Sequence, residues 1–212
     1  LSANGIPVPR HVVMERGDEP LGDLRLPAIV KPSREDASHG IESASVVRDE
    51  TALLARVAHV LEHYAQPAIV EEFVDGREIN VALLAGPNGL EVLPLSEIDY
   101  RGFPPDMPRI VSYAGKWIET SRDWALTQVV AAADLDATTR ARIESIARRA
   151  FAVLGLSGYG RVDMRLDARG APFVIDVNPN PDISPDAGFA LAAARAGLTH
   201  ADVVARILAS TS

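Results

Sequence analysis

Polar and apolar side chains alternate on two short stretches near the end of the chain, residues 160–166 and 172–177. In an extended strand, Arg161, Asp163 and Arg165 project from one face. On the second stretch and the residue after it, Asp176 and Asn178 face one way, and Ile175 and Val177 face the other. A turn over residues 167–170 would join the stretches as a hairpin and place Asp163 roughly opposite Asp176. Two carboxylates this close repel each other unless a cation lies between them.

This pattern indicates an all-oxygen metal site. The carboxylates of Asp163 and Asp176 and the amide oxygen of Asn178 suit Mg²⁺, which keeps water and phosphate oxygens as its other ligands. An ordinary solvated sheet face, with acids beside arginines, is the alternative, and the repeated pattern favours metal. A glycosidase-like acid pair fits less well, because adjacent strands place the carboxyls too close and a neighbouring arginine keeps both ionised.

Lysine is rare in this chain, since Lys31 and Lys116 are the only lysines among 21 basic residues. Lys31 ends an apolar stretch and precedes the polar loop 32–40, which contains serine and glycine. It could hold phosphates while the loop closes over them, although the Gly-x₄-Gly-Lys order of a Walker A loop is absent. A solvated lysine at a strand end remains the alternative.

Residues 70–78 form a third candidate site. Glu71, Phe73 and Val74 lie along an apolar strand edge, and Glu78 follows a turn at residues 75–76. The edge could present backbone groups to a flat base, and Glu78 could present a carboxylate to ribose hydroxyls. An ordinary strand–turn–strand with exposed acids explains the same residues, so this segment alone leaves both interpretations open.

Composition limits the class of protein. A chain of 212 residues with 47% apolar content can bury a core of one domain, in one or two lobes. We expect a cytoplasmic protein without membrane or nucleic-acid partners, because apolar runs of membrane length and cysteines are absent and the formal charge is −8. The chain begins at Leu1 rather than Met, which predicts processing, cutting or a longer parent.

The elements expected around these residues mix strands and helices without strict βαβ alternation, which predicts an α+β fold with antiparallel sheet. Helices are expected from Asp49 or Thr51, from Asp136 to Gly155, and at 186–196 and 200–209. Residues 96–120, which contain Lys116, are expected to be irregular. Strands are expected at 8–14, 27–31, 41–47, 68–73, 78–85, 90–93, 160–166 and 172–177.

Four segments, IVKPSRE(x)₄GI, IVEEFVDGREINVALL, SGYGRVDMRLD and FVIDVNPNPDIS, together resemble the D-alanine–D-alanine ligase branch of the ATP-grasp superfamily. The resemblance runs from about Gly5 to the last helix. It implies an ATP-grasp fold in which two α+β lobes with mainly antiparallel sheets grip the nucleotide between them. Residues 1–74 would form the central lobe, with a phosphate flap at 32–40, and residues 75–212 the C-terminal lobe with the metal site.

The resemblance also implies roles for individual residues. Asp163, Asp176 and Asn178 would hold Mg²⁺, as two ions that Mn²⁺ can replace, while Arg161 and Lys116 would be catalytic. The residues implied to bind ATP are Lys31, Ser38, Glu71, Phe73, Val74, Glu78 and Lys116. The implied function is an ATP- and Mg²⁺-dependent carboxylate–amine ligase that acts on small molecules through an acyl phosphate. The alternatives are a non-catalytic or regulatory nucleotide-binding module, and a ligase with a thiol or ammonia acceptor.

Several positions depart from the family pattern. Asp36-Ala37 replaces a Gly-Ser pair in the flap, and Trp117 replaces a tyrosine. Asp176 replaces a glutamate, Asp182 a glycine and Ala187 a serine. We therefore do not expect D-alanyl-D-alanine synthesis. The expected substrate residues are Asn180, Asp182, Ser184 and Asp186.

Asp182 and Asp186 could receive a cationic amine, and helix capping by Asp186 is the alternative. Family members also carry an upstream α/β domain and a further phosphate-contacting lysine, which we expect to be supplied in cis or by another chain. A homodimer is a further expectation.

Overall fold

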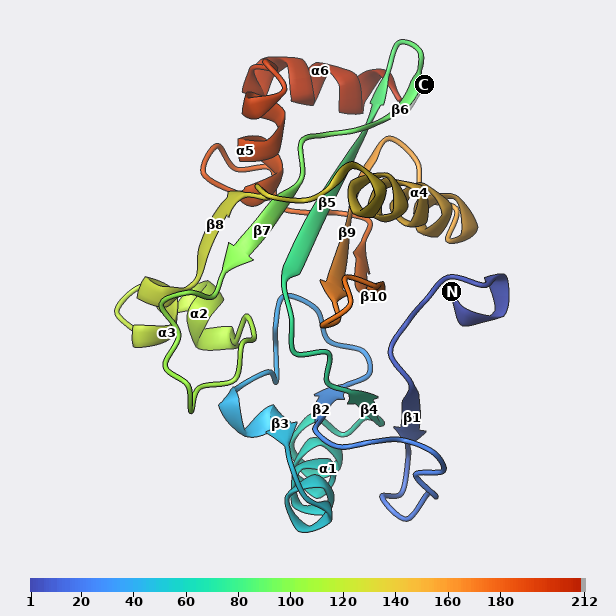
Figure 1. Cartoon of the computed structure of the whole chain (residues 1–212), viewed down its shortest axis with the longest axis vertical. Helices are drawn as coiled ribbons and strands as arrows, with labels where there is room; N and C mark the ends of the chain where they lie inside the picture. Colours follow the sequence, from blue (N-terminus) through green and yellow to red (C-terminus); the bar gives the residue numbers. More distant parts are fainter. Residues whose placement is uncertain (211–212) are drawn as a thin grey trace. The chain divides into compact units, whose positions relative to one another are not determined.

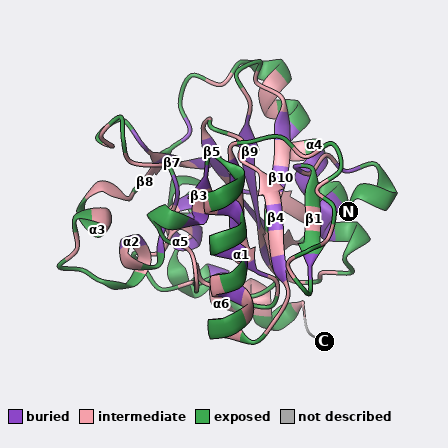
Figure 2. Cartoon of the chain, turned by 90° about the horizontal axis from the view of Figure 1, so that it is seen from below, coloured by how far each residue is buried: buried purple, intermediate pink, exposed green. Residues whose placement is uncertain are grey.

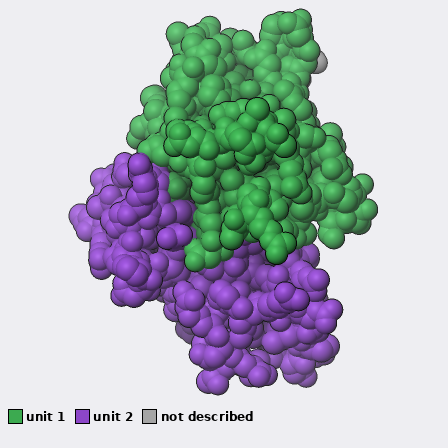
Figure 3. Space-filling view, in the orientation of Figure 1, with its two compact units in different colours: residues 1–8, 75–98, 129–212 green, residues 9–74, 99–128 purple. Residues whose placement is uncertain are grey.

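The computed structural model describes residues 1–210, which form two compact units (Figure 3). Unit 1 contains residues 1–8, 75–98 and 129 to the end of the described chain, and unit 2 contains residues 9–74 and 99–128. Each unit is therefore built from separate segments. The division expected from the resemblance, 1–74 and 75–212, places residues 1–8 and 99–128 in the opposite units.

Unit 2 is built on a four-stranded antiparallel sheet with the order β1-β4-β2-β3 (Figure 1). The helix α1 packs on this sheet, and its Leu53, Val57 and Val60 form a core with Val30 and Val70. The helix begins after Asp49, whose side chain accepts a hydrogen bond from the amide of Ala52. The elements of this unit are β1 (His11–Met14), β2 (Ala28–Pro32), η2 (Ser43–Ser45), β3 (Val46–Val47), α1 (Glu50–Tyr64), β4 (Ala68–Glu72), α2 (Tyr113–Trp117) and α3 (Arg122–Leu126).

Two segments differ from the sequence-based expectations. The strand expected at 41–47 shortens to β3, because the 3-10 turn η2 precedes it and is fixed by a capping box between Glu42 and Ser45. The region expected to be irregular, 96–120, contains β7 (Ser96–Asp99) and the short helix α2. Ser112 caps α2 by accepting from the amide of Gly115, a signal that can be read from the sequence.

Unit 1 contains a six-stranded sheet in the order β10-β9-β5-β7-β8, with β6 paired to β5. Its long central strands β5 and β9 are largely buried (Figure 2). The remaining elements are η1 (Ser2–Asn4), β5 (Glu78–Gly86), β6 (Gly89–Val92), β7, β8 (Gln128–Ala131), α4 (Ala137–Val153), β9 (Tyr159–Leu166), β10 (Pro172–Asn178), α5 (Gly188–Arg195) and α6 (His200–Ala209). The expected α+β class with antiparallel sheet is confirmed.

Helices cover both faces of this sheet. On one face, Ile143 and Ile146 of α4 pack with Val81, Val162 and Met164. On the other face, Phe189 of α5 and Val203 of α6 pack with Ala82 and Leu84. Because successive side chains of β5 point to opposite faces, this one strand contributes residues to both cores. The rest of the second face, beyond Ala82, carries the polar residues of the candidate site.

The helix ends follow the sequence closely. Asp136 caps α4, and Gly155 follows it with a positive φ of 68°. Thr199 and Asp202 form the expected capping box at the start of α6. Of the helices within residues 1–210, none combines the length and apolarity needed to span a bilayer.

Candidate functional site

The polar face of the unit 1 sheet is made by three adjacent strands. Asp163 of β9 lies opposite Asp176 of β10, and Arg161 lies opposite Asn178. On the other side of β9, Asp163 lies opposite Asn80 of β5, and Arg165 lies opposite Glu78. The hairpin expected from the sequence therefore has the predicted pairing of its two acids, and β5 adds a third row of polar residues.

A β-bulge in β10 produces this pairing. Val174 lies opposite Met164, yet Asp176 lies opposite Asp163, so Ile175 is an extra residue at the register shift. The bulge also explains why Val174 and Val177 pack against the same core, although they are three residues apart. We expected Ile175 and Val177 to share a face by simple alternation. That expectation is wrong, because the bulge restarts the alternation after Val174.

Asp163 is held by strong hydrogen bonds. Arg161 donates from Nε to Oδ1 and from Nη2 to Oδ2 of Asp163, both at 2.8 Å. Asn80 donates from Nδ2 to Oδ1 of Asp163, also at 2.8 Å. The negative charge of Asp163, followed by those of Asp176 and Glu78, raises the pKa of the Arg161 guanidinium above its usual value, while burial opposes the shift. Arg161 is therefore a fixed cation surrounded by three carboxylates.

Glu78 and Arg165 form a buried ion pair on the same face. Arg165 Nη2 lies 2.7 Å from Glu78 Oε2, and the exposed fractions of the two side chains are 4% and 9%. The sequence pointed to Glu78 as a ribose ligand but gave Arg165 no role. The carboxylate of Glu78 thus has a neutralising partner within its own unit.

The donor set on β9 and β10 fits a hard divalent cation. Asp176 is exposed, so its carboxylate is accessible. Asn178 Oδ1 accepts a 2.8 Å bond from the amide of Asn180, which leaves its second lone pair available. Residues 1–210 contain no group of three or more His, Cys, Asp and Glu side chains placed to hold a metal ion. The candidate set instead consists of two carboxylates and one amide oxygen, with Arg161 beside them.

In unit 2, the structure brings together two of the residues that were expected to bind nucleotide. Glu71 of β4 pairs with Ile29 of β2, two residues before Lys31 on the same face. Lys31 Nζ consequently lies 2.8 Å from Glu71 Oε2, and both side chains are mostly buried. Just beyond β4, the amide of Phe73 donates to the carbonyl of Pro27. Phe73 and Val74 thus leave the sheet from a fixed position.

The loop 32–40, here called the flap, is anchored to α2, which carries Lys116. Trp117 Nε1 donates to the carbonyl of Ala37 at 2.9 Å. Ala37 and the neighbouring Ser38 have positive φ values of 52° and 63°, a backbone conformation that costs energy without support from its surroundings. Lys116 Nζ lies 5.5 Å from the Trp117 ring centroid. Two departures from the family pattern, at residues 37 and 117, therefore interact with each other.

Further contacts hold the end of the flap. The ring of His39 packs edge-on against both Tyr64 and Tyr113. Buried Arg56 of α1 donates to the Gly40 carbonyl at 2.9 Å and also pairs with Glu42. Sequence analysis assigned Arg56 no role, because an arginine within a helix gives no signal of burial. Its position beside the apolar stripe of α1 is the only hint in the sequence.

The expected substrate residues follow β10 in unit 1. Tyr159 donates its hydroxyl to Asn180 Oδ1. Asp182 Oδ1 accepts from the amide of Ser184 at 2.8 Å and so forms a local turn. Ala187, not Asp186, is the N-cap of α5, and no side chain caps this helix. Capping by Asp186 is therefore wrong, and the exposed Asp186 carboxylate does not serve the helix end.

Sequence reasoning missed Asn80, Arg165 and Tyr159. Asn80 and Glu78 are two residues apart on β5, so alternation placed them on one face, but nothing in the sequence showed that β5 lies beside β9. Arg165 was placed on the same face as Asp163 without a partner. Strand order depends on contacts between distant segments, which residue patterns along one strand do not contain.

Comparisons with known proteins agree with this arrangement. The family model described as "D-ala D-ala ligase C-terminus" matches residues 1–209. D-alanine–D-alanine ligase A of Mesorhizobium japonicum is 35% identical over 206 residues, covering 94% of this chain and 54% of that relative. The uncharacterized protein y4sG of Sinorhizobium fredii is 34% identical, covering 97% of this chain and 58% of that protein. The chain thus spans little more than half the length of these curated relatives.

Solved structures show the same fold at lower sequence identity. A D-alanine–D-alanine ligase from Bacillus anthracis complexed with ATP matches with a TM-score of 0.76 and 20% identity, covering 99% of this chain and 62% of that one. The D-alanine–D-alanine ligase of Coxiella burnetii matches with a TM-score of 0.76 and 21% identity, covering 99% of this chain and 53% of that one. The chain therefore has the ATP-grasp fold and belongs to the D-ala D-ala ligase C-terminus family.

Proposed function

We propose that this chain is the nucleotide-binding and catalytic part of an ATP- and Mg²⁺-dependent ligase that joins a carboxylate to an amine. In the first step, a substrate carboxylate oxygen attacks the γ-phosphorus of ATP, and ADP leaves. In the second step, the amine nitrogen attacks the acyl carbon of the acyl phosphate, inorganic phosphate leaves, and the nitrogen loses a proton. Membership of the family and the order of the site residues support this reaction class.

The pairing of Asp163 with Asp176, beside Arg161 and Asn178, is the observation that carries the proposal. Asp163, Asp176 and Asn178 would hold Mg²⁺, which supplies positive charge to the phosphate oxygens when it is bound. The two hydrogen bonds from Arg161 to Asp163 hold its guanidinium beside the acid pair, next to the position that we assign to the transferring phosphoryl group. Most of the work of these residues is electrostatic.

Unit 2 contributes the two lysines in this proposal. Lys31 and Lys116 are the compact point charges that we assign to phosphate oxygens, and Glu71 holds Lys31 at the end of β2. The flap carries Ser38 in a left-handed conformation supported by Trp117. We assign Phe73 and Val74 to the base, and Glu78 to the ribose.

Trapping of the acyl phosphate tests the reaction class. Hydroxylamine converts an acyl phosphate into a hydroxamate, so the full-length protein, with ATP, Mg²⁺ and a panel of carboxylates, should release ADP and form hydroxamate. We expect Asp163→Asn and Asp176→Asn to lower this rate at least a hundredfold. Asp134→Asn is the matched control, because Asp134 is exposed and already has a positive φ of 56° that asparagine tolerates.

Two results would contradict the proposal. Equal loss in Asp134→Asn would mean that the substitutions act through folding rather than through the acid pair. Binding of Mg²⁺ and ATP without ADP release, across a panel of acids and amines, would favour the non-catalytic nucleotide-binding module instead.

We further propose that Asp182 and Asp186 receive a cationic amine, so that the substrates differ from two D-alanines. The variant Asp182→Asn separates charge from structure, because asparagine can still accept the bond from the Ser184 amide. We expect a roughly tenfold higher KM for the amine and an unchanged KM for ATP, measured by ADP release. An unchanged amine KM would reject this assignment and leave the reaction class standing.

A further inference from the structure

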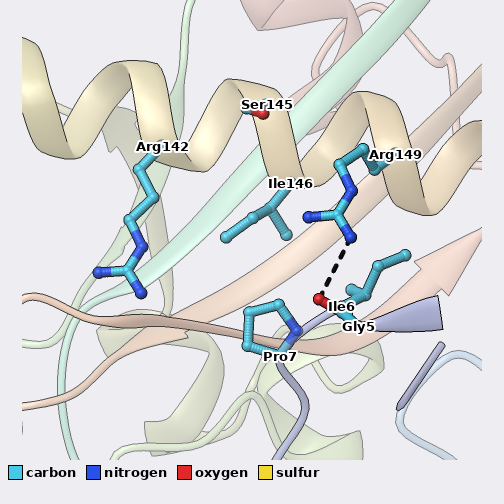
Figure 4. Close-up of a pocket in the computed structure, with 7 residues that line it drawn as sticks. All are labelled: Gly5, Ile6, Pro7, Arg142, Ser145, Ile146 and Arg149. Carbon is cyan, nitrogen blue, oxygen red and sulfur yellow. Dashed lines mark hydrogen bonds between the residues drawn. The ribbon is translucent and has the colours of Figure 1, made fainter. Parts of the chain in front are cut away.

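A pocket of about 550 Å³ lies between α4 and the first residues of the chain, within unit 1 (Figure 4). This volume is in the range of sites that hold small organic molecules. One wall is the face of α4 that carries Arg142, Ser145, Ile146 and Arg149. The opposite wall is the segment Gly5, Ile6 and Pro7.

The lining combines cations with an apolar floor. Arg142 and Arg149 are two helical turns apart, so both extend from the same side of α4, on either side of Ile146 (Figure 4). Pro7 adds apolar surface across from Ile146, while the side chain of Ile6 is 1% exposed and packs in the core of unit 1. A guanidinium group presents a planar fork of donors that matches carboxylate and phosphate oxygens.

The charge on this helix is not neutralised by acids. α4 carries Arg140, Arg142, Arg148 and Arg149 with a single glutamate, in a chain whose formal charge is −8. Arg149 donates to the carbonyls of Asn4 and Gly5, and Arg148 donates to the carbonyl of Leu90, so both retain their full charge. Within residues 1–210, the side chain of the exposed Arg142 has no hydrogen-bond or ion-pair partner.

The pocket is separate from the catalytic residues proposed above. Ile146 packs against Val162 and Met164, on the opposite face of β9 from Arg161 and Asp163. A ligand in this pocket would therefore contact neither the acid pair nor the turn at Asp182.

We propose that this pocket is a second binding site, for a small organic anion that carries a carboxylate or phosphate group on an apolar body. Arg142 binds the anionic group, Arg149 adds charge while fixing the wall at Asn4 and Gly5, and Pro7 with the accessible edge of Ile146 contacts the apolar body. The two arginines set the sign of the ligand charge. The apolar floor distinguishes an organic anion from a bare inorganic one.

Phenyl phosphate is a suitable probe, because it combines a dianion with a ring. We expect titration into the isotope-labelled full chain to shift the NMR amide signals of Gly5, Ile6, Ser145, Ile146 and Arg149. Inorganic phosphate and phenol should each bind the pocket at least tenfold more weakly. Localisation by amide shifts separates this site from any phosphate binding at Lys31 or Arg161, so the result is independent of the proposed ligase reaction.

Arg142→Gln should weaken the binding of phenyl phosphate about tenfold, because it removes a charged donor without a structural partner. Arg140→Gln is the matched control, since it makes the same charge change on the same helix outside the pocket, and it should change the affinity less than twofold. Equal weakening in both variants would overturn the proposal, because it would mean that only the general field of the helix attracts the anion.

Two other outcomes would also overturn it. Equal affinity for inorganic phosphate and phenyl phosphate would mean that the apolar floor is not used. Tighter binding of a short Asp/Glu-rich peptide at the same amides would assign the pocket to a protein partner rather than to a small molecule.

Discussion

The charged residues of the candidate site occur as pairs within each unit. Lys31 lies against Glu71, Arg161 against Asp163, and Arg165 against Glu78. Each ion pair holds a cationic side chain in one position. The sequence patterns did not predict these pairs. Ordering these side chains during folding reduces the reorganisation needed when a phosphate ligand arrives.

The buried pair of Glu78 and Arg165 gives a prediction for stability. Arg165→Met should destabilise the fold by about 3–5 kcal/mol, because it leaves the Glu78 carboxylate buried without its cation. Urea denaturation measures this change in the free energy of unfolding. The exposed pair of Arg16 and Asp18 is the control, and Arg16→Met should leave the free energy of unfolding nearly unchanged.

Replacing both partners tests the cause. The double variant Glu78→Met/Arg165→Met should lose less stability than Arg165→Met alone, since no charge is then left buried. A double variant that is as unstable as the sum of its two single variants would mean that side-chain packing, rather than the ion pair, determines the loss.

At the residue scale, the sequence predicted which side chains of β9 share a face and which residues belong to the candidate site. Alternation on β9 placed Arg161, Asp163 and Arg165 correctly, because that strand is regular. On β10, alternation placed Ile175 on the wrong face, because this strand contains a bulge. The bulge lets Val174 and Val177 both pack in the core, and alternation along one strand does not predict this. The partner of Arg165 could not be read from the sequence, since it lies on a strand that is distant along the chain.

At the scale of elements, the flap and α2 form a connected pair in unit 2. The indole of Trp117 bonds to the flap at Ala37, and the amide of Tyr113 bonds to the carbonyl of Ile41 just after it. The side chain that follows Lys116 in sequence therefore also supports the left-handed turn of the flap.

Trp117→Phe should loosen the flap without unfolding unit 2. The ring is retained while the 2.9 Å bond to Ala37 is lost, so hydrogen exchange of the flap amides 36–40 should accelerate about fivefold, corresponding to about 1 kcal/mol. Trp124→Phe is the matched control, because Trp124 is also partly exposed and its side chain makes no hydrogen bond within residues 1–210. Equal acceleration in both variants would contradict a specific role for Trp117.

Local signals predicted most elements well. Asp49, Asp136 and Thr199 cap the helices that begin after them, because a cap acts within one turn of the chain. The segment 96–120 was predicted poorly. β7 is a strand because it pairs with β5 across the sheet, and this pairing, rather than local propensity, determines its structure.

At the scale of the whole molecule, residues 99–128 form an insertion between two strands of the sheet of unit 1. β7 and β8 are neighbours in that sheet, and the amide of Ala132 donates to the carbonyl of Leu95. The chain therefore leaves and re-enters the sheet on adjacent strands. Lys116, the lysine that we assign to catalysis, lies in this insertion.

Replacing residues 100–127 with a short Gly-Ser linker should leave unit 1 folded. The NMR amide signals of β5 and β9 should keep their positions, because their core with α4 lies entirely within unit 1. The flap in unit 2 should exchange faster, since it loses its bond to Trp117, and Ile41 just after it loses its bond to Tyr113. Loss of the β5 and β9 signals would show that the two units do not fold separately.

The extra residue in β10 has an evolutionary consequence. Deleting Ile175 would remove the bulge and leave Val174 opposite Met164 and Asp176 opposite Asp163, with the alternation unbroken between them. The acids would still oppose each other, so a descendant protein could lose this codon and keep the reaction. Loss of the codon for Val177 would instead turn Asn178 toward the side of the sheet where Val162 packs, while a search for the ligand residues would still count all of them as present.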